Sequence, residues 1–296
     1  MSFTGSVALC CFDDYSNFMY QLEQALLSIG VNAKGFKLVN HPFGYPNQCE
    51  LIHPDLMNDA IKDFDIVIAC HSFISPLIHS KVIPYHTGTA FRQNPDYYNE
   101  LFKESPFSLI ALPEFNLTAK NPKYLVGCVD TDSIKPTKQI NEVLTFGHFP
   151  PNHLVKGTST INKVLNETGV NYISDSNLVS YSENLKRLDS CDIIIELFAD
   201  GQGGKPYGSF GMTALEAAAL GKIVITQNNS GQELYNDTYG FCPLNFVKDE
   251  NKLISTIKTL DNYQGEYIKG QQDQTREWVV KNHSYKATAE KLISYL

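Results

Sequence analysis

Residues 208–231 constrain the fold more than any other stretch of this chain. They read GSFGMTALEAAALGKIVITQNNSG. Glycines flank a Ser-Phe pair, good helix formers run from Met212 to Leu220, Gly221 ends the expected helix, and β-branched residues follow at 223–226. A glycine-bearing loop that leads into a helix presents backbone N–H groups at the positive end of the helix dipole. The stretch therefore predicts a loop, a helix and a strand, with a seat for phosphate where the helix begins.

Glu216 lies about one turn into that expected helix, on the side that faces the same ligand. A carboxylate beside phosphate is repelled unless it accepts hydrogen bonds from hydroxyl groups, so a ribose diol is its natural partner. The alternative is a surface glutamate that is favoured by the helix dipole. The residues of the helix alone leave both interpretations open.

The pattern S-F-G-x-x-x-L-E-A-x-A-x-G-K-x-V-I-T begins at Ser209 and resembles the donor-site signature of retaining glycosyltransferases of the GT-B fold (glycosyl transferases group 1, family 4-like). The resemblance implies that Glu216 holds the ribose of a nucleotide sugar. It also implies that the donor lies against Ser209, Phe210, Gly211, Met212 and Thr213. The family usually has a second glutamate eight positions before the first, where this chain has Gly208, and this departure leaves the identity of the sugar open.

Length and composition suit two globular domains of ordinary size. The chain has 296 residues, and a hydrophobic fraction of 43% is enough to fill two cores. A formal net charge of −8 counts against tight binding to duplex nucleic acid and gives no support to an electrostatic membrane anchor, although a local basic groove is compatible with it.

The cysteines indicate a reducing compartment. Seven of them are scattered over apolar segments without a C-x-x-C pair, which argues against a disulfide framework and a structural zinc site. The first residues lack a charged segment followed by a long apolar run, and no run approaches the ~18 apolar residues of a membrane span. We therefore expect a cytoplasmic location.

The first half of the chain alternates strand-like and helix-like segments, as in a doubly wound α/β domain. Residues 7–12 predict a buried strand, and a helix is expected from Ser16 or Asn17 to Ile29. Ligands of such folds bind at the carboxyl ends of strands, so Ser16 and Asn17 are candidates for donor contacts, although a plain helix cap is the commoner use of both residue types. Further strands are expected at 32–39, 64–70, 82–85, 108–112 and 124–129.

His86 follows the expected strand at 82–85 and opens the loop His-Thr-Gly-Thr. Five of the eight histidines lie between positions 41 and 86, but none forms a helical i, i+4 pair, so no metal site is expected. The segment VIPYHTGTAFR resembles the part of GT-B glycosyltransferases where a histidine faces the donor sugar across the interdomain cleft. The resemblance implies a catalytic, hydrogen-bonding role for His86, with a solvated turn residue as the alternative, and it leaves Arg92 facing either acceptor or solvent.

Residues 127–136 resemble the G-V-D-x-x-x-F-x-P segment that leads from the first domain of this family to the second, and their polar, proline-containing composition fits a linker. We therefore expect an acceptor-side domain at 1–136 and a nucleotide-sugar-binding domain at 137–296. The resemblance implies two Rossmann-like doubly wound α/β domains that face each other across a cleft, with a C-terminal helix that crosses back to the first domain. His283, before that helix, is expected to be a cap or hinge.

Lys156 and His148 mark the expected diphosphate site. A strand expected at 142–146, then Gly147-His148, a loop and Lys156-Gly157 before a helix resemble the family's strand, Gly-Arg, loop and Lys-Gly, where two cations bind the donor diphosphate. Lys156 matches this pattern. His148 replaces the arginine, so the second charge depends on protonation. A lysine at a helix start is otherwise disfavoured, because it opposes the helix dipole unless an anion is bound.

The loop at 198–207 contains G-Q-G-G-K, but its spacing differs from that of a P-loop, and Pro206 stands where Ser or Thr would bind magnesium. We interpret this loop as a lid.

These segments follow the order of the family over nearly the whole chain. The resemblance implies a hexosyl- or pentosyltransferase that moves sugar from a nucleotide-sugar donor to a hydroxyl of a saccharide or glycoconjugate, with retention, without a metal and without a further cofactor. His86 and Lys156 are the expected catalytic residues. The alternatives are a phage- or virus-type glycosyltransferase that acts on hydroxymethylated DNA bases, a nucleotide-sugar epimerase and a non-catalytic sugar-nucleotide-binding protein. The sequence leaves donor, acceptor and oligomeric state open.

Overall fold

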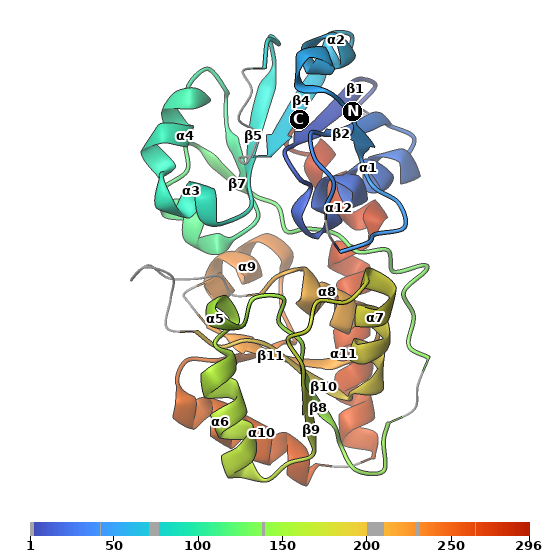
Figure 1. Cartoon of the computed structure of the whole chain (residues 1–296), viewed down its shortest axis with the longest axis vertical. Coiled ribbons are helices and arrows are strands. Elements are labelled where there is room, and N and C mark those ends of the chain that lie inside the picture. Colours follow the sequence, from blue (N-terminus) through green and yellow to red (C-terminus); the bar gives the residue numbers. More distant parts are fainter. Residues whose placement is uncertain are drawn as a thin grey trace. The chain divides into compact units, whose positions relative to one another are not determined.

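The computed structural model describes residues 3–41, 43–70, 77–137, 140–199, 210–228, 231–263 and 265–296. The chain forms two compact α/β units (Figure 1). One contains the residues up to Cys128 together with His283–Leu296, and the other contains Val129–Asn282. The chain thus leaves the first unit after Cys128, before the boundary expected near Pro136, and returns to it at His283.

The first unit is built on a parallel sheet with the strand order β3-β2-β1-β4-β5-β6-β7. Its strands are β1 (Ser6–Cys11), β2 (Asn32–Lys37), β3 (Glu50–Leu51), β4 (Ile66–Cys70), β5 (Val82–His86), β6 (Ser108–Ile110) and β7 (Pro122–Tyr124). Chain order reverses at β1, so the carboxyl ends of β1 and β4 form the switch point where such sheets bind ligands.

The helices of this unit are α1 (Phe18–Ser28), α2 (Met57–Ile61), α3 (Thr89–Gln93), α4 (Pro95–Leu101) and α12 (Tyr285–Ile293). Helix α12, red in Figure 1, packs beside the blue α1. Ala289 and Leu292 of α12 share one buried cluster with Leu22 and Leu26 of α1. The last helix of the chain therefore packs with α1 in the core on one face of the first sheet.

The second unit has a parallel sheet with the order β12-β11-β10-β8-β9. Its strands are β8 (Phe146–His148), β9 (Tyr172–Ser174), β10 (Ile193–Leu197), β11 (Ile223–Gln227) and β12 (Asn245–Val247). Here the chain order reverses at β8, so the switch point lies between the carboxyl ends of β8 and β10. Two parallel, doubly wound units confirm the expected fold class.

The second unit contains α5 (His153–Lys156), α6 (Thr158–Thr168), α7 (Tyr181–Ser190), α8 (Met212–Ala219), α9 (Gly231–Tyr239), α10 (Glu250–Asn262) and α11 (Glu266–His283) up to Asn282. Helix α8 is buried from Ala214 to Ala219, because its alanines let it approach neighbouring elements closely. Helices α6 and α10 lie side by side in Figure 1 and are in contact. Among the described helices, none is both long and apolar enough to cross a bilayer.

Strand β8 begins later than the sequence predicts. The backbone N–H groups of Asn141 and Thr145 donate to the carboxylate of Asp192 at 3.1 and 2.9 Å. The expected strand residues 142–145 are therefore tied to a side chain, and regular pairing starts at Phe146.

Candidate functional site

The switch point of the second unit brings together side chains from three strands and one helix. His148 ends β8, Glu196 lies near the end of β10, Thr226 lies near the end of β11, and Lys156 ends α5. The Lys156 ammonium forms an ion pair with Oε1 of Glu196, and Thr226 Oγ1 donates to Oε2 of Glu196 at 3.3 Å. The Glu196 side chain is 1% exposed, and that of Lys156 is 16% exposed. The site thus contains a buried carboxylate and a lysine that keeps one side toward solvent.

Gly157 fixes the position of Lys156. Its φ of +70° is a left-handed conformation, and an added Cβ would lie 1.6 Å from the carbonyl oxygen of Phe198, so only glycine fits there. The Phe198 N–H donates to the Lys156 carbonyl at 3.2 Å. Asn152 caps the short helix α5 by accepting from Val155 N. The backbone of Lys156 is therefore held against the carboxyl end of β10.

His148 does not supply the second cation. Its side chain is fully buried, and its Nδ1–H donates to the Ile195 carbonyl at 2.7 Å. Its Nε2 then accepts from the Thr158 hydroxyl at 2.9 Å. Burial lowers its pKa from 6.5 to about 4, and the nearby Lys156 charge adds to this shift. The imidazole is neutral at pH 7 and links β8 to β10 and to the start of α6, so Lys156 is the cation that this part of the site offers to a diphosphate.

Glu216 is buried within the second unit and is not a surface residue of α8. Its side chain is hydrogen-bonded to Tyr181 on α7, and it is 4% exposed. Burial raises the pKa of its carboxyl group from 4.5 to about 8, although the Tyr181 hydrogen bond lowers it. The interpretation of Glu216 as a solvated, dipole-favoured glutamate is therefore wrong. Its contact with a ribose stays a prediction.

The start of α8 lies next to this ion pair. Gly211 is the N-cap of α8 and carries no side-chain acceptor, so the first-turn N–H groups of Met212 and Thr213 have no acceptor within the helix. A methyl group on Gly211 would lie 3.4 Å from Oε1 of Glu196. Lys156 and the helix N-terminus, which are far apart in the sequence, are thus linked through one carboxylate.

Phe210 is anchored beneath this helix start. Its ring packs edge-on against Tyr235 and Trp278, with centroids 5.6 and 5.9 Å away, and the indole N–H of Trp278 donates to the Tyr235 hydroxyl at 2.9 Å. Phe210 therefore positions the loop end by packing. Gly208, Ser209 and positions 200–207 of the expected lid lie outside the described residues.

Asp14 caps α1 in the first unit, a role that the sequence did not predict. Its carboxylate accepts from Met19 N at 2.7 Å and from Tyr20 N at 3.1 Å. Ser16 and Asn17 have positive φ angles and do not cap the helix through their side chains. The alternative of plain capping by Ser16 or Asn17 is therefore wrong. A donor contact of Ser16 or Asn17 stays a prediction.

Asp14 also belongs to a buried group with Cys11 and Cys49, whose potential metal-ligand atoms lie within 4.8 Å of one another. The sequence gave no sign of this group, because Cys49 reaches it through the loop before β3. Three ligands among the described residues are fewer than the four of a closed structural zinc site. All seven cysteines are buried free thiols.

His86 ends β5 and is fully buried. Its ring stacks on Phe91 with a centroid distance of 3.7 Å. The alternative of a solvated turn residue is therefore wrong, and the sugar contact stays a prediction. Arg92 does not face solvent, because its guanidinium donates to Glu114 at 2.6 Å and its side chain is 4% exposed. Its contact with an acceptor stays a prediction.

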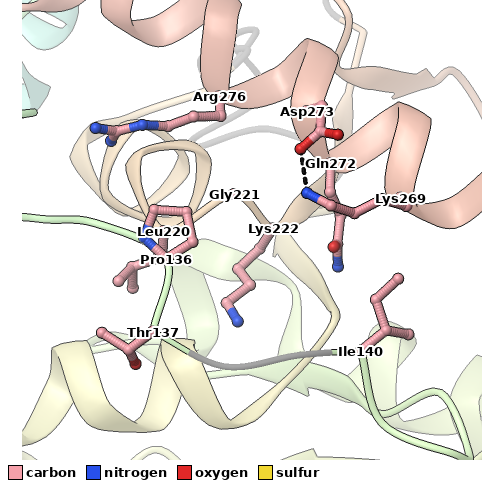
Figure 2. Close-up of a pocket in the computed structure, with 10 residues that line it drawn as sticks. All are labelled: Pro136, Thr137, Ile140, Leu220, Gly221, Lys222, Lys269, Gln272, Asp273 and Arg276. Carbon is pink, nitrogen blue, oxygen red and sulfur yellow. Dashed lines mark hydrogen bonds and ion pairs between the residues drawn. The ribbon is translucent and has the colours of Figure 1, made fainter.

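A cavity of about 580 Å³ lies elsewhere in the second unit, beside α11 and the segment that begins β11 (Figure 2). It contains none of the expected site residues. Its cations are engaged within the protein: Lys222 pairs with Asp189 at 3.0 Å, Lys269 pairs with Asp273, and Arg276 donates to backbone carbonyls including those of Thr131 and Ile134. The cavity is thus separate from the carboxyl-end site.

Solved structures share this fold over the whole chain. A glycosyltransferase from Rickettsia africae ESF-5 is 13% identical with a TM-score of 0.69, covering 99% of this chain and 98% of that chain. Alr3699/HepE from Anabaena, solved in complex with UDP and glucose, is 11% identical with a TM-score of 0.69, covering 98% and 99%. The N-terminal domain of Candida albicans trehalose-6-phosphate phosphatase is 9% identical with a TM-score of 0.66, covering 99% and 97%.

No protein-family model matches the sequence, and no curated protein sequence is significantly similar to it. At identities of 9 to 13%, the structural similarity establishes the fold and not the activity. The chain therefore has the two-unit α/β fold found in GT-B glycosyltransferases.

Proposed function

We propose that this protein is a glycosyltransferase that uses a nucleotide sugar as its donor. One observation carries the proposal: Lys156 and the N-terminus of α8 meet at Glu196, at the switch point of the second sheet. Cations and helix-start amides both bind phosphate, and switch points are where such sheets bind nucleotides. The fold supports the same conclusion, since Alr3699/HepE has been solved with UDP-glucose.

In the proposed reaction, the bond between the anomeric carbon and the diphosphate breaks through an oxocarbenium-like state, and negative charge develops on the leaving diphosphate. Lys156 and the first-turn N–H groups of α8 stabilise that charge. Glu216 accepts hydrogen bonds from the ribose hydroxyls. The acceptor oxygen bonds to the anomeric carbon as its hydroxyl proton passes to a donor phosphate oxygen, and His86 orients the sugar. Because Lys156 supplies positive charge to the diphosphate, we propose that the transfer proceeds without a metal ion.

We further propose that the sugar is transferred with retention to a hydroxyl of a saccharide or glycoconjugate. This part of the proposal rests on the resemblance of residues 209–226 to the retaining family and on the order of the other resembling segments along this chain.

The experiment is a screen of UDP-, GDP-, ADP- and TDP-sugars by thermal shift and by release of nucleoside diphosphate, with and without saccharide acceptors. A bound donor raises the melting temperature according to its affinity. We expect one donor class to stabilise the protein and to be turned over, and we expect Glu216→Ala to abolish both effects. Full turnover by that variant would contradict the proposed site.

A second candidate is a sugar-nucleotide-binding protein without transferase activity. The neutral state of His148 favours it, because the site then has one cation fewer than the resembled pattern. Gly208 in place of the sugar-contacting glutamate points the same way. The same screen separates the two functions, because this candidate predicts stabilisation by a donor with neither transfer nor hydrolysis.

A further inference from the structure

Glu196 places negative charge at the point where the proposed diphosphate binds. Its Oε1 atom pairs with the Lys156 ammonium, and the same atom lies 3.4 Å from the position that a methyl group on Gly211 would occupy. One carboxylate oxygen therefore adjoins both the cation and the helix start that the proposed function assigns to phosphate.

An irregularity in the backbone of β10 orients the Glu196 side chain. Glu196 lies in an otherwise apolar run, IIIEL, of the central strand β10. Ile195 pairs with Ile225 and Leu197 pairs with Thr226, so the register shifts at Glu196 in the manner of a β-bulge. Bulges redirect side chains and occur often beside functional sites.

The carboxylate is also held in a fixed environment. Thr226 donates to its second oxygen at 3.3 Å, and the whole Glu196 residue is 3% exposed. A charge buried this deeply requires a partner, and Lys156 is that partner. Glu196 offsets part of the Lys156 charge, so Lys156 does not present its full positive charge to a ligand.

We infer that Glu196 limits the affinity of this site for a diphosphate by neutralising Lys156. The inference rests on the proposed function and adds a residue that sets how tightly the diphosphate is held. A bound diphosphate shares Lys156 with a carboxylate of the same charge sign, and this repulsion weakens retention of the nucleoside diphosphate product. The proposed function places the ribose at Glu216 and not at this pair, so we expect the affinity for the nucleoside portion to be unaffected.

The test is calorimetric titration of UDP, GDP, ADP and TDP, and of their uncharged nucleosides, into wild type and Glu196→Gln. Glutamine keeps the shape of the side chain, accepts from Lys156 through its carbonyl and removes the charge. For the diphosphate that binds, we expect the dissociation constant of Glu196→Gln to be roughly tenfold lower than that of wild type, or lower still. The affinity for the nucleoside is expected to be unchanged. Glu183→Gln removes one charge at an exposed site on α7 and is the matched control, for which no tightening is expected.

If Glu196→Gln binds the diphosphate with an affinity equal to or weaker than that of wild type, the inference is overturned and the proposed function stays in place. Failure of all four diphosphates to bind any variant contradicts the proposed function itself, and the inference falls with it.

The double variant Lys156→Gln/Glu196→Gln keeps the net charge of the pair at zero and provides a second test should Glu196→Gln fold poorly. We expect it to bind the diphosphate more tightly than Lys156→Gln alone, because in that single variant the Glu196 charge repels the diphosphate without a cation beside it. Equal diphosphate affinity of these two variants would overturn the inference.

Discussion

The carboxyl group of Glu216 is hydrogen-bonded to Tyr181 in the interior of the second unit, where burial raises the pKa of that carboxyl group to about 8. Helices α7 and α8 thus meet around an acidic group that is largely protonated at neutral pH. The proposed ribose contact requires the ionised form, which accepts hydrogen bonds from two hydroxyls. Two measurable pH effects follow from this requirement.

The first effect is on nucleotide affinity. Below pH 8 the ligand must displace the proton of Glu216, so we expect nucleoside affinity to rise with pH, by up to about tenfold per unit, and to level off above about pH 8. Calorimetric titration of the nucleoside in steps of about half a pH unit, between pH 6.5 and 9, measures this dependence. Glu216→Gln, which cannot ionise, is expected to bind more weakly and without this slope. The same slope in both proteins would rule out Glu216 as its source.

The second effect is on stability. The folded protein keeps a proton on Glu216 that the unfolded chain releases above its ordinary pKa of 4.5. The free energy of unfolding is therefore expected to fall as pH rises from 4.5 to about 8, by up to about 1.4 kcal/mol per pH unit. Urea unfolding of wild type and Glu216→Gln from pH 7 to 8 isolates the effect, and parallel curves would contradict it.

Acid is expected to destabilise the protein through two buried histidines. Burial lowers the pKa of His148 to about 4 and that of His283 to about 3, both from 6.5. The unfolded chain takes up these protons below pH 6.5 while the folded protein excludes them, so their contribution is lost as pH falls from 6.5 toward 4. Urea unfolding at pH 7 and pH 5 should show a smaller loss for His148→Gln than for wild type. His53→Ala, at an exposed position, should lose as much as wild type.

Gly157 offers a sharp test of how Lys156 is positioned. Gly157→Ala combines a left-handed φ with a methyl group 1.6 Å from the Phe198 carbonyl oxygen, so we expect a loss of about 3 kcal/mol or more in the free energy of unfolding, together with loss of diphosphate binding. Gly169 has the same φ of +70° with no atom within 4 Å of an added Cβ. Gly169→Ala should therefore cost only about 1 kcal/mol and leave binding intact. Similar effects of the two substitutions would show that the Phe198 contact is unimportant.

Local patterns predicted much of the fold. The apolar runs that became β1, β4 and β10 and the alanine-rich α8 follow from composition and periodicity alone. Lys156 is predicted from the resemblance of Lys156-Gly157 to the family's Lys-Gly pattern, and the helix dipole disfavours the alternative of a solvated lysine. These features depend on residues that are neighbours in the sequence.

The features of the fold and the site that the sequence did not predict depend on tertiary contacts. In the sequence, Glu196 is a single polar residue in an expected strand. Only the order of β8, β10 and β11 in the sheet places it between Lys156 and Thr226. The neutral state of His148 follows from its burial, and the capping of α1 by Asp14 requires a turn of positive φ angles that non-glycine residues seldom adopt. The late start of β8 likewise depends on the distant Asp192.

The central claim is that a nucleoside diphosphate binds where Lys156 meets the start of α8. Its most direct test is calorimetric titration of UDP, GDP, ADP and TDP into wild type, Lys156→Met and the matched control Lys163→Met, whose lysine is exposed on α6. We predict that at least one diphosphate binds wild type and the control equally, and binds Lys156→Met at least about tenfold more weakly because the buried Glu196 is left without its cation. Wild-type affinity in Lys156→Met, or no binding of any diphosphate to the wild-type protein, would contradict the account.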